Sequence, residues 1–177
     1  RIEIISIPNI IFIIFMIFIF FLMIGDTEIY TLYLHDALPI YFQLKVLKET
    51  YGQQSSLLSD LPITDNNYIR EIMMLSDNEP CILGQTTIPE ETFKHNGWLA
   101  NLGAKGLGEA MANLPNVSRS AFNFSFCVSK HPLLKQYGVN PLEKEGVKLW
   151  VRRSSFCIES RPLWVVEIFL PKIYELG

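Results

Sequence analysis

The sequence of 177 residues has only three cysteines, three histidines and no surplus of basic charge. So few cysteines exclude a disulfide scaffold and are typical of a protein from a reducing compartment. Their spacing is not that of metal ligands, which excludes a cysteine-based metal site. With 18 acidic and 15 basic side chains, the chain lacks the basic face of a general nucleic-acid-binding protein. It also has no glycine-rich loop followed by Lys and Ser or Thr, which excludes a P-loop nucleotide site.

Residues 1–40 differ in composition from the rest of the chain. Ile10–Ile24 is an uninterrupted apolar run, mostly Ile and Phe, that approaches the length of a bilayer-spanning helix. However, Leu34–Ile40 (Leu-His-Asp-Ala-Leu-Pro-Ile) resembles the translation of a common short-read sequencing adapter. We interpret residues 1–40 as an artefactual, chimeric segment, so His35 and Asp36 are not candidate catalytic residues. The alternative, a membrane anchor, depends on residues 1–24 being genuine.

Residues 41–177 have equal numbers of acidic and basic side chains and are long enough to bury a core. Alternating patterns predict strands over residues 42–48, 68–75, 81–88, 117–128, 147–158 and 163–170. A helix is expected to start at Pro89 and run to about residue 102, with a second over residues 107–113 and a helical or irregular segment over residues 131–140. The sequence therefore predicts an α+β fold, with a single antiparallel sheet of about six strands and helices on one face.

Two charged side chains lie in the middle of apolar strand faces. Alternation places Arg70 on the same face as Ile72 and Met74, and Glu167 on the same face as Val165 and Phe169. A charge in such a position is costly unless it is paired or used. Two interpretations are open: Arg70 and Glu167 form a buried ion pair or lie at a wet edge, or both line a binding site.

Two other segments can bind anions. Gly106-Leu107-Gly108 precedes a short helix, so its N–H groups can face a negative charge, although such glycines are commonly just a turn. Arg152 and Arg153 are adjacent in a strand and must point to opposite faces, so at least one is directed at the interior or the helix layer. The alternative is that both arginines are exposed to solvent, in which case they need no functional explanation. His95 and His131 lack triad partners at any known spacing.

In their order along the chain, these residues resemble the bacterial chorismate pyruvate-lyase family. The resemblance covers about residues 41–174. It rests on Arg70-Glu71-Ile72, Gly84 with Pro89, Leu102-Gly103 with Leu107-Gly108, Leu149-Trp150 with Arg152-Arg153-Ser154, and Glu167-Ile168-Phe169-Leu170-Pro171. It implies a cytoplasmic lyase without cofactor or metal, which splits chorismate into 4-hydroxybenzoate and pyruvate in ubiquinone biosynthesis. We also expect a monomer with no nucleic-acid partner, and with no membrane partner unless residues 1–24 are genuine.

The resemblance assigns Arg70 and Glu167 as catalytic residues, and Arg70, Leu107 and Glu167 as substrate-binding residues. A guanidinium group and helix N-terminal amides suit the carboxylates of chorismate. A carboxyl group at Glu167 can hydrogen-bond the breaking ether or the phenol of the product.

The chain departs from the family pattern at three places. Gln85 stands where the family commonly has Arg, so one positive contact is expected to be weaker, and Val151 stands where Gly is frequent. The family's N-terminal helices would lie before Tyr41, so we expect the chain to lack them. The alternative function is a non-catalytic effector-binding domain of the same fold, as in GntR-type transcription regulators.

Overall fold

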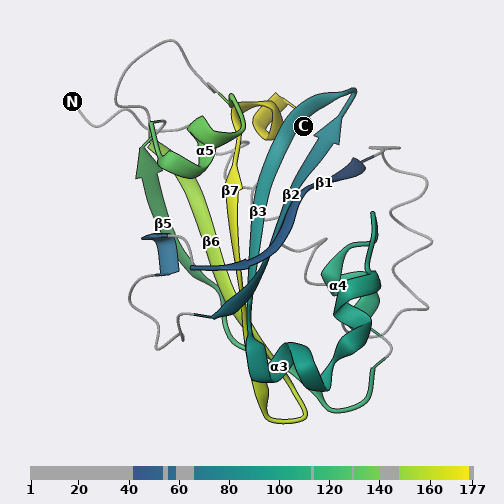
Figure 1. Cartoon of the computed structure of the whole chain (residues 1–177). Helices are drawn as coiled ribbons and strands as arrows, with labels where there is room; N and C mark the ends of the chain where they lie inside the picture. Colours follow the sequence, from purple (N-terminus) through teal and green to yellow (C-terminus); the bar gives the residue numbers. More distant parts are fainter. Residues whose placement is uncertain are drawn as a thin grey trace, which may run out of the picture.

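The computed structural model describes residues 42–53, 56–58, 66–112, 114–128, 130–139 and 148–175. The interpretations of residues 1–40 lie outside the described residues. In the described part of the chain, seven strands form one sheet in the order β1-β2-β3-β7-β6-β4, and β5 also pairs with β6 (Figure 1). The strands are β1 (Phe42–Gly52), β2 (Asn67–Ser76), β3 (Glu79–Pro89), β4 (Val117–Arg119), β5 (Asn123–Val128), β6 (Lys148–Ile158) and β7 (Arg161–Phe169). All of the pairings are antiparallel.

The predicted α+β class with one antiparallel sheet is confirmed. The sheet has a seventh strand because the segment predicted as one strand, residues 117–128, forms the two strands β4 and β5. These two strands pair with different parts of β6: β4 with residues 156–158, and β5 with residues 148–153.

Tight two-residue turns join the strands of the two central hairpins. Asp77 and Asn78 join β2 to β3 with φ values of 51° and 64°, and Glu159 and Ser160 join β6 to β7 with φ values of 48° and 68°. Turns with both central residues in the left-handed region match the right-handed twist of paired strands. The short β6–β7 turn is followed by one register along the whole hairpin, whereas the register of β2 and β3 shifts between Met74 and Leu75.

The helical segments are α3 (Glu90–His95), α4 (Leu107–Met111), α5 (Pro132–Gln136) and the 3₁₀ turns η1 (Ser56–Leu58), η2 (Gly97–Asn101) and η3 (Pro171–Glu175). The helix predicted from Pro89 to about residue 102 is interrupted at Asn96, whose φ of −124° and ψ of 57° are not helical. The buried amide of Asn96 donates to the carbonyl oxygen of Thr92 at 3.0 Å. This contact fixes the break between α3 and η2.

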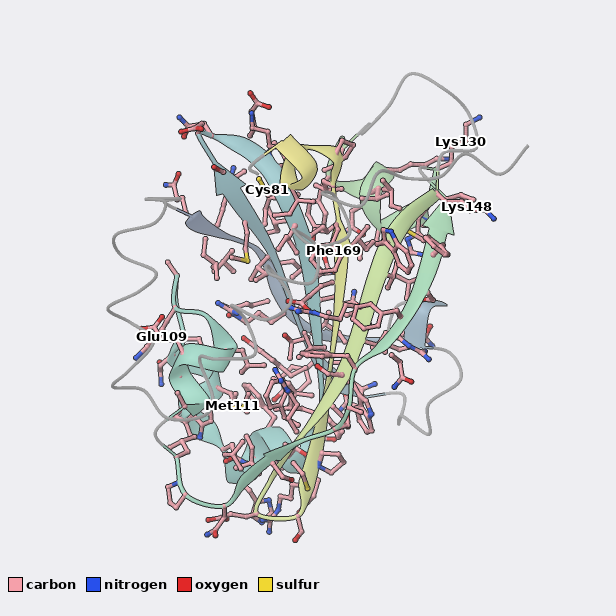
Figure 2. All side chains as sticks on the ribbon, turned by 180° about the vertical axis from the view of Figure 1, so that it is seen from behind. Cys81, Glu109, Met111, Lys130, Lys148 and Phe169 are labelled. Atoms are coloured by element: carbon pink, nitrogen blue, oxygen red, sulfur yellow. The ribbon has the colours of Figure 1, made fainter. Side chains whose placement is uncertain are left out.

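Helical segments cover both faces of the sheet, whereas the sequence predicted helices on one face only. Leu134 of α5 packs with Val151 and Ile168, while Met111 of α4 packs with Phe156. Val151 and Phe156 are an odd number of residues apart in β6, so they point to opposite faces. Both faces need a cover because apolar side chains line both. In Figure 2, Met111 lies at α4, while Glu109 extends outward from the same helix.

Within the described ranges, no helix is both long enough and apolar enough to cross a membrane.

Candidate active site

A cavity lies on the sheet face that α4 covers, and it brings together Arg70, Leu107 and Glu167. Its floor is made by side chains of β2, β3, β7 and β6 that alternate onto this face. Its empty volume is about 720 Å³, a figure that includes the open solvent at its mouth. Its other lining residues are Leu44, Ile72, Met74, Ile82, Gly84, Thr86, Gly106, Gly108, Arg119, Phe122, Arg152, Ser154, Phe156 and Val165.

Arg70 is 1% exposed and is held by Glu49. Its Nε donates to Oε1 of Glu49 at 3.1 Å, across the register pair Glu49↔Arg70 between β1 and β2. A register shift between Val46 and Lys48 creates this pair. Without that extra residue, the register of Val46 would set Lys48 opposite Arg70, and two like charges would face each other. The bulge thus converts a repulsive pair into an ion pair.

Backbone carbonyls orient the rest of the Arg70 guanidinium group. Its Nη2 donates to the carbonyl oxygens of Gly103 at 2.7 Å and Lys105 at 3.1 Å, which ties β2 to the loop before α4. Burial lowers the pKa of Arg70 and Glu49 opposes that change, so the group stays cationic. Among the described residues, these bonds leave the two N–H groups of Nη1 for a ligand.

Leu107 is the first residue of α4 and is buried at the cavity wall. A residue in the first turn of a helix has no helical acceptor for its N–H. Gly106, at the N-cap, has an extended backbone with φ −67° and ψ 140°, and both Gly106 and Gly108 line the cavity beside Leu107. The backbone amide of Leu107 is therefore a hydrogen-bond donor at the cavity wall. The loop directly before it is the one whose carbonyl groups accept from Arg70.

Glu167 pairs with Arg152, not with Arg70. Oε2 of Glu167 accepts from Nε of Arg152 at 2.6 Å, and both residues are buried. The two-residue turn between β6 and β7 sets Arg152 directly opposite Glu167. The Arg70–Glu167 ion pair, one of the two interpretations that the sequence left open, is therefore excluded, because β3 lies between their strands and each charge has its own partner.

Arg119 and Phe122 also line the cavity, although no pattern in the sequence singles them out. The Cζ of Arg119 lies 4.2 Å from the ring centre of Phe122, and the Cζ of Arg152 lies 4.6 Å from the same centre. Burial and the positive charge of Arg152 lower the pKa of Arg119, while Glu167 raises it. Alternation cannot reveal this cluster, because the chain leaves the sheet between β4 and β5. As a result, the odd-numbered residues of β4 and the even-numbered residues of β5 point to the same face of the sheet.

Gly84 lies at the floor of the cavity. It stands between Ile72 and Glu167 in the sheet register. A Cβ at this position would lie 2.9 Å from Cγ1 of Ile72, closer than side chains normally approach. The glycine therefore lets the side chain of Ile72 pack closely against β3.

Gln85 lies on the opposite face of the sheet from the cavity, so the expectation of a weaker ligand contact there is wrong. Its amide donates to Oε1 of Glu71 at 2.7 Å, and Glu71 also accepts from Gln136 at 3.2 Å and from the hydroxyl of Tyr137. Gln85 follows Gly84 directly, so the alternation of the strand separates the two. The network joins β2 and β3 to the end of α5.

We expect Tyr137→Phe to lower the free energy of unfolding by about 1–3 kcal/mol, because buried Glu71 loses a hydrogen-bond donor to a charged acceptor. Burial and the bond to Glu71 raise the pKa of Tyr137 well above its usual range, so the hydroxyl remains a donor. Urea unfolding measures the loss. Binding in the cavity should be unchanged, since the network is on the other face. A loss of ligand affinity at unchanged stability would contradict this assignment.

The remaining candidates lie away from the cavity. Arg153 donates to the carbonyl oxygen of Leu57 at 3.1 Å on the opposite face, as its alternation with Arg152 requires. His131 caps α5, where Nδ1 accepts from the N–H of Leu133, and His95 is exposed beside Glu91. Val151 is fully buried in the core of the opposite face. The Val that stands here in place of the family's frequent Gly therefore changes the packing of that core.

The three cysteines are free thiols. Burial raises the pKa of the Cys127 thiol to about 11, which keeps it protonated and unreactive. Within the described ranges, no cluster of three or more His, Cys, Asp or Glu side chains could hold a metal ion.

Comparisons with known sequences agree on one family. The sequence model of the chorismate lyase family matches residues 43–176. A probable chorismate pyruvate-lyase of Thiobacillus denitrificans is 33% identical over 108 residues, covering 60% of this chain and 57% of that protein. A protein of the same name from Psychromonas ingrahamii is 30% identical over 141 residues, covering 76% of this chain and 74% of that protein. The chain thus spans between about half and three quarters of the length of these relatives.

A solved structure shares the fold at low sequence identity. The ligand-binding domain of a GntR-family transcriptional regulator from Bordetella bronchiseptica matches with a TM-score of 0.53 and 12% identity. The match covers 77% of this chain and 86% of that domain. At this identity the likeness establishes the fold alone, and it does not favour a regulatory function over an enzymatic one.

Proposed function

The chain belongs to the chorismate lyase family, and we propose that it cleaves chorismate to 4-hydroxybenzoate and pyruvate through a catalytic domain at residues 41–177. The observation that carries this proposal is the cavity with Arg70 and Leu107 at one end and Glu167 two strands away. Neighbouring strands are about 4.8 Å apart, so a six-membered ring with polar groups in para positions can bridge the two ends. The proposal includes the cytoplasmic location and the place in ubiquinone biosynthesis that the resemblance implies.

The ring carboxylate of chorismate binds at the Arg70 end in this proposal. Nη1 of Arg70 and the N–H of Leu107 supply donors from two different elements. Glu49 and the two backbone carbonyls hold the guanidinium group in place before the ligand arrives. Because this cation is already held in place, its side chain loses little conformational entropy when the ligand binds.

Glu167 faces the ring carbons that react. The reaction removes the hydrogen at C4 as a proton and breaks the ether bond at C3, which makes the ring aromatic. The released enolpyruvate then takes up a proton and becomes pyruvate. The carboxylate of Glu167, fixed by Arg152 at 2.6 Å, hydrogen-bonds the 4-hydroxyl and orients the ring as charge moves to the leaving oxygen. Aromatisation supplies the driving force, so positioning and electrostatic stabilisation are the tasks of the protein.

The direct test is incubation of the purified protein with chorismate, with 4-hydroxybenzoate quantified by chromatography. We expect 4-hydroxybenzoate and pyruvate in equal amounts, well above the spontaneous background. Arg153→Ala is the matched control, because it removes a neighbouring guanidinium group on the other face and should keep the activity. An effector-binding domain would bind 4-hydroxybenzoate or chorismate without turnover, and that result would reject the enzymatic proposal.

A further inference from the structure

Three arginines and one glutamate line the cavity, and one of the arginines, Arg70, is also paired with Glu49 outside the lining. Arg70 is on β2, while Arg119, Arg152 and Glu167 gather around β6 and β7. The positive charge is therefore distributed over two ends, with apolar side chains such as Ile72 and Val165 between them. This pattern fits a ligand with two separate anionic groups better than a monoanion.

The end of the cavity that holds Glu167 is lined by two arginines and one glutamate. Arg152 uses Nε on Glu167 and is 2% exposed, so its position is fixed by the hairpin. Arg119 is less buried and lies against Phe122. Burial, and then the like charge of Arg152, disfavour the cationic form of Arg119, and an incoming carboxylate would oppose both effects. Arg119 is thus a cation at the cavity wall that is stabilised when an anion binds.

The chemistry of the proposed substrate places its second carboxylate at this end. In chorismate the enolpyruvyl ether is on C3, adjacent to the C4 hydroxyl that Glu167 faces in the proposed function. Once the ring carboxylate is at Arg70, the side-chain carboxylate must lie on the Glu167 side of the cavity. Arg119 and Arg152 are the cations that line the cavity there.

We propose that Arg119, supported by Arg152, binds the carboxylate of the enolpyruvyl group, the part of the substrate that leaves as pyruvate. This inference rests on the proposed function and adds a specificity determinant to it. Arg119 distinguishes the dianionic substrate from the product 4-hydroxybenzoate, which has no carboxylate at that position. When the C3–O bond breaks, its electron pair goes to the enolpyruvate oxygen, and the same cation stabilises that developing charge.

Two stable probes separate the two carboxylate subsites. 4-Hydroxybenzoate has only the ring carboxylate, whereas 3-(carboxymethoxy)-4-hydroxybenzoate adds an ether-linked carboxylate at the neighbouring carbon. We expect Arg119→Met to weaken binding of the dicarboxylate by about 10–100-fold in calorimetry. Binding of 4-hydroxybenzoate should change by less than about threefold. The KM for chorismate should rise in parallel with the dicarboxylate Kd.

Two variants control for charge and for folding. Arg119→Lys keeps the cation and should recover part of the dicarboxylate affinity. Arg161→Met removes an arginine that pairs with Glu159 at the β6–β7 turn, outside the cavity lining, and should leave both affinities unchanged. Thermal melting shows whether each variant is folded at the assay temperature.

The outcomes are distinct. Equal weakening of both probes by Arg119→Met, with no recovery in Arg119→Lys, would assign Arg119 a purely structural role and overturn the inference. Unchanged dicarboxylate affinity and KM would also overturn it while leaving chorismate cleavage intact. If the unmodified protein neither binds 4-hydroxybenzoate nor cleaves chorismate, the proposed function itself fails.

Discussion

Arg70→Ala is expected to weaken binding of both chorismate and 4-hydroxybenzoate by about 2–4 kcal/mol, because a buried carboxylate loses its charged donor. Both ligands should be affected alike, since they share the ring carboxylate. The variant also removes the donors that Gly103 and Lys105 accept from, so some stability will be lost. Calorimetry with 4-hydroxybenzoate at a temperature well below melting measures the binding effect separately.

Arg70→Lys is the conservative control for this prediction. A lysine keeps the charge but cannot reproduce the bonds to Glu49, Gly103 and Lys105 at once. We expect it to recover only part of the affinity. If Arg70→Ala lowers the melting temperature but leaves the Kd for 4-hydroxybenzoate unchanged, Arg70 serves only to join β2 to the loop before α4, and its role in binding is wrong.

Glu167→Gln is expected to lower kcat by about 10²-fold or more while changing chorismate affinity much less. The amide keeps the shape of the side chain but loses the negative charge that orients the ring hydroxyl. The same change leaves Arg152 buried without its carboxylate partner, which is expected to cost about 3–5 kcal/mol of stability. Steady-state kinetics and urea unfolding measure these two effects independently.

The double variant Arg152→Met/Glu167→Gln separates the chemical role of Glu167 from its structural role. Removing the buried cation should recover much of the stability. The kcat at saturating chorismate should stay low because the carboxylate is still absent, whereas the loss of Arg152 should raise KM. If the double variant regains both stability and kcat, the loss in Glu167→Gln comes from folding alone, and the catalytic assignment is contradicted.

Alternation in the sequence was sufficient to select Arg70 and Glu167, since each is a charge on an apolar strand face. It could not select their partners, which depend on how strands pair. Glu49 stands opposite Arg70 only because of the register shift before Lys48. Arg152 stands opposite Glu167 because the β6–β7 turn has two residues. The sequence shows a turn between these strands, but a turn longer or shorter by one residue would set a different side chain opposite Glu167.

Gln85 and Arg119 show two different limits of the sequence interpretation. The position of Gln85 could have been predicted, because a strand residue directly after Gly84 must point to the opposite face. Arg119 could not have been predicted in the same way. The break in the chain between β4 and β5 brings Arg119 and Phe122 together despite the odd spacing between them.

The central claim is that one cavity orients an aromatic acid between Arg70 and Glu167, and a crystal structure of the protein with bound 4-hydroxybenzoate tests it most directly. The predicted result has the carboxylate within hydrogen-bond distance of Nη1 of Arg70 and the N–H of Leu107, and the hydroxyl on the carboxylate of Glu167. A ligand bound in the reverse orientation, with its carboxylate on Arg119 and Arg152, or a ligand bound outside this cavity, would contradict it.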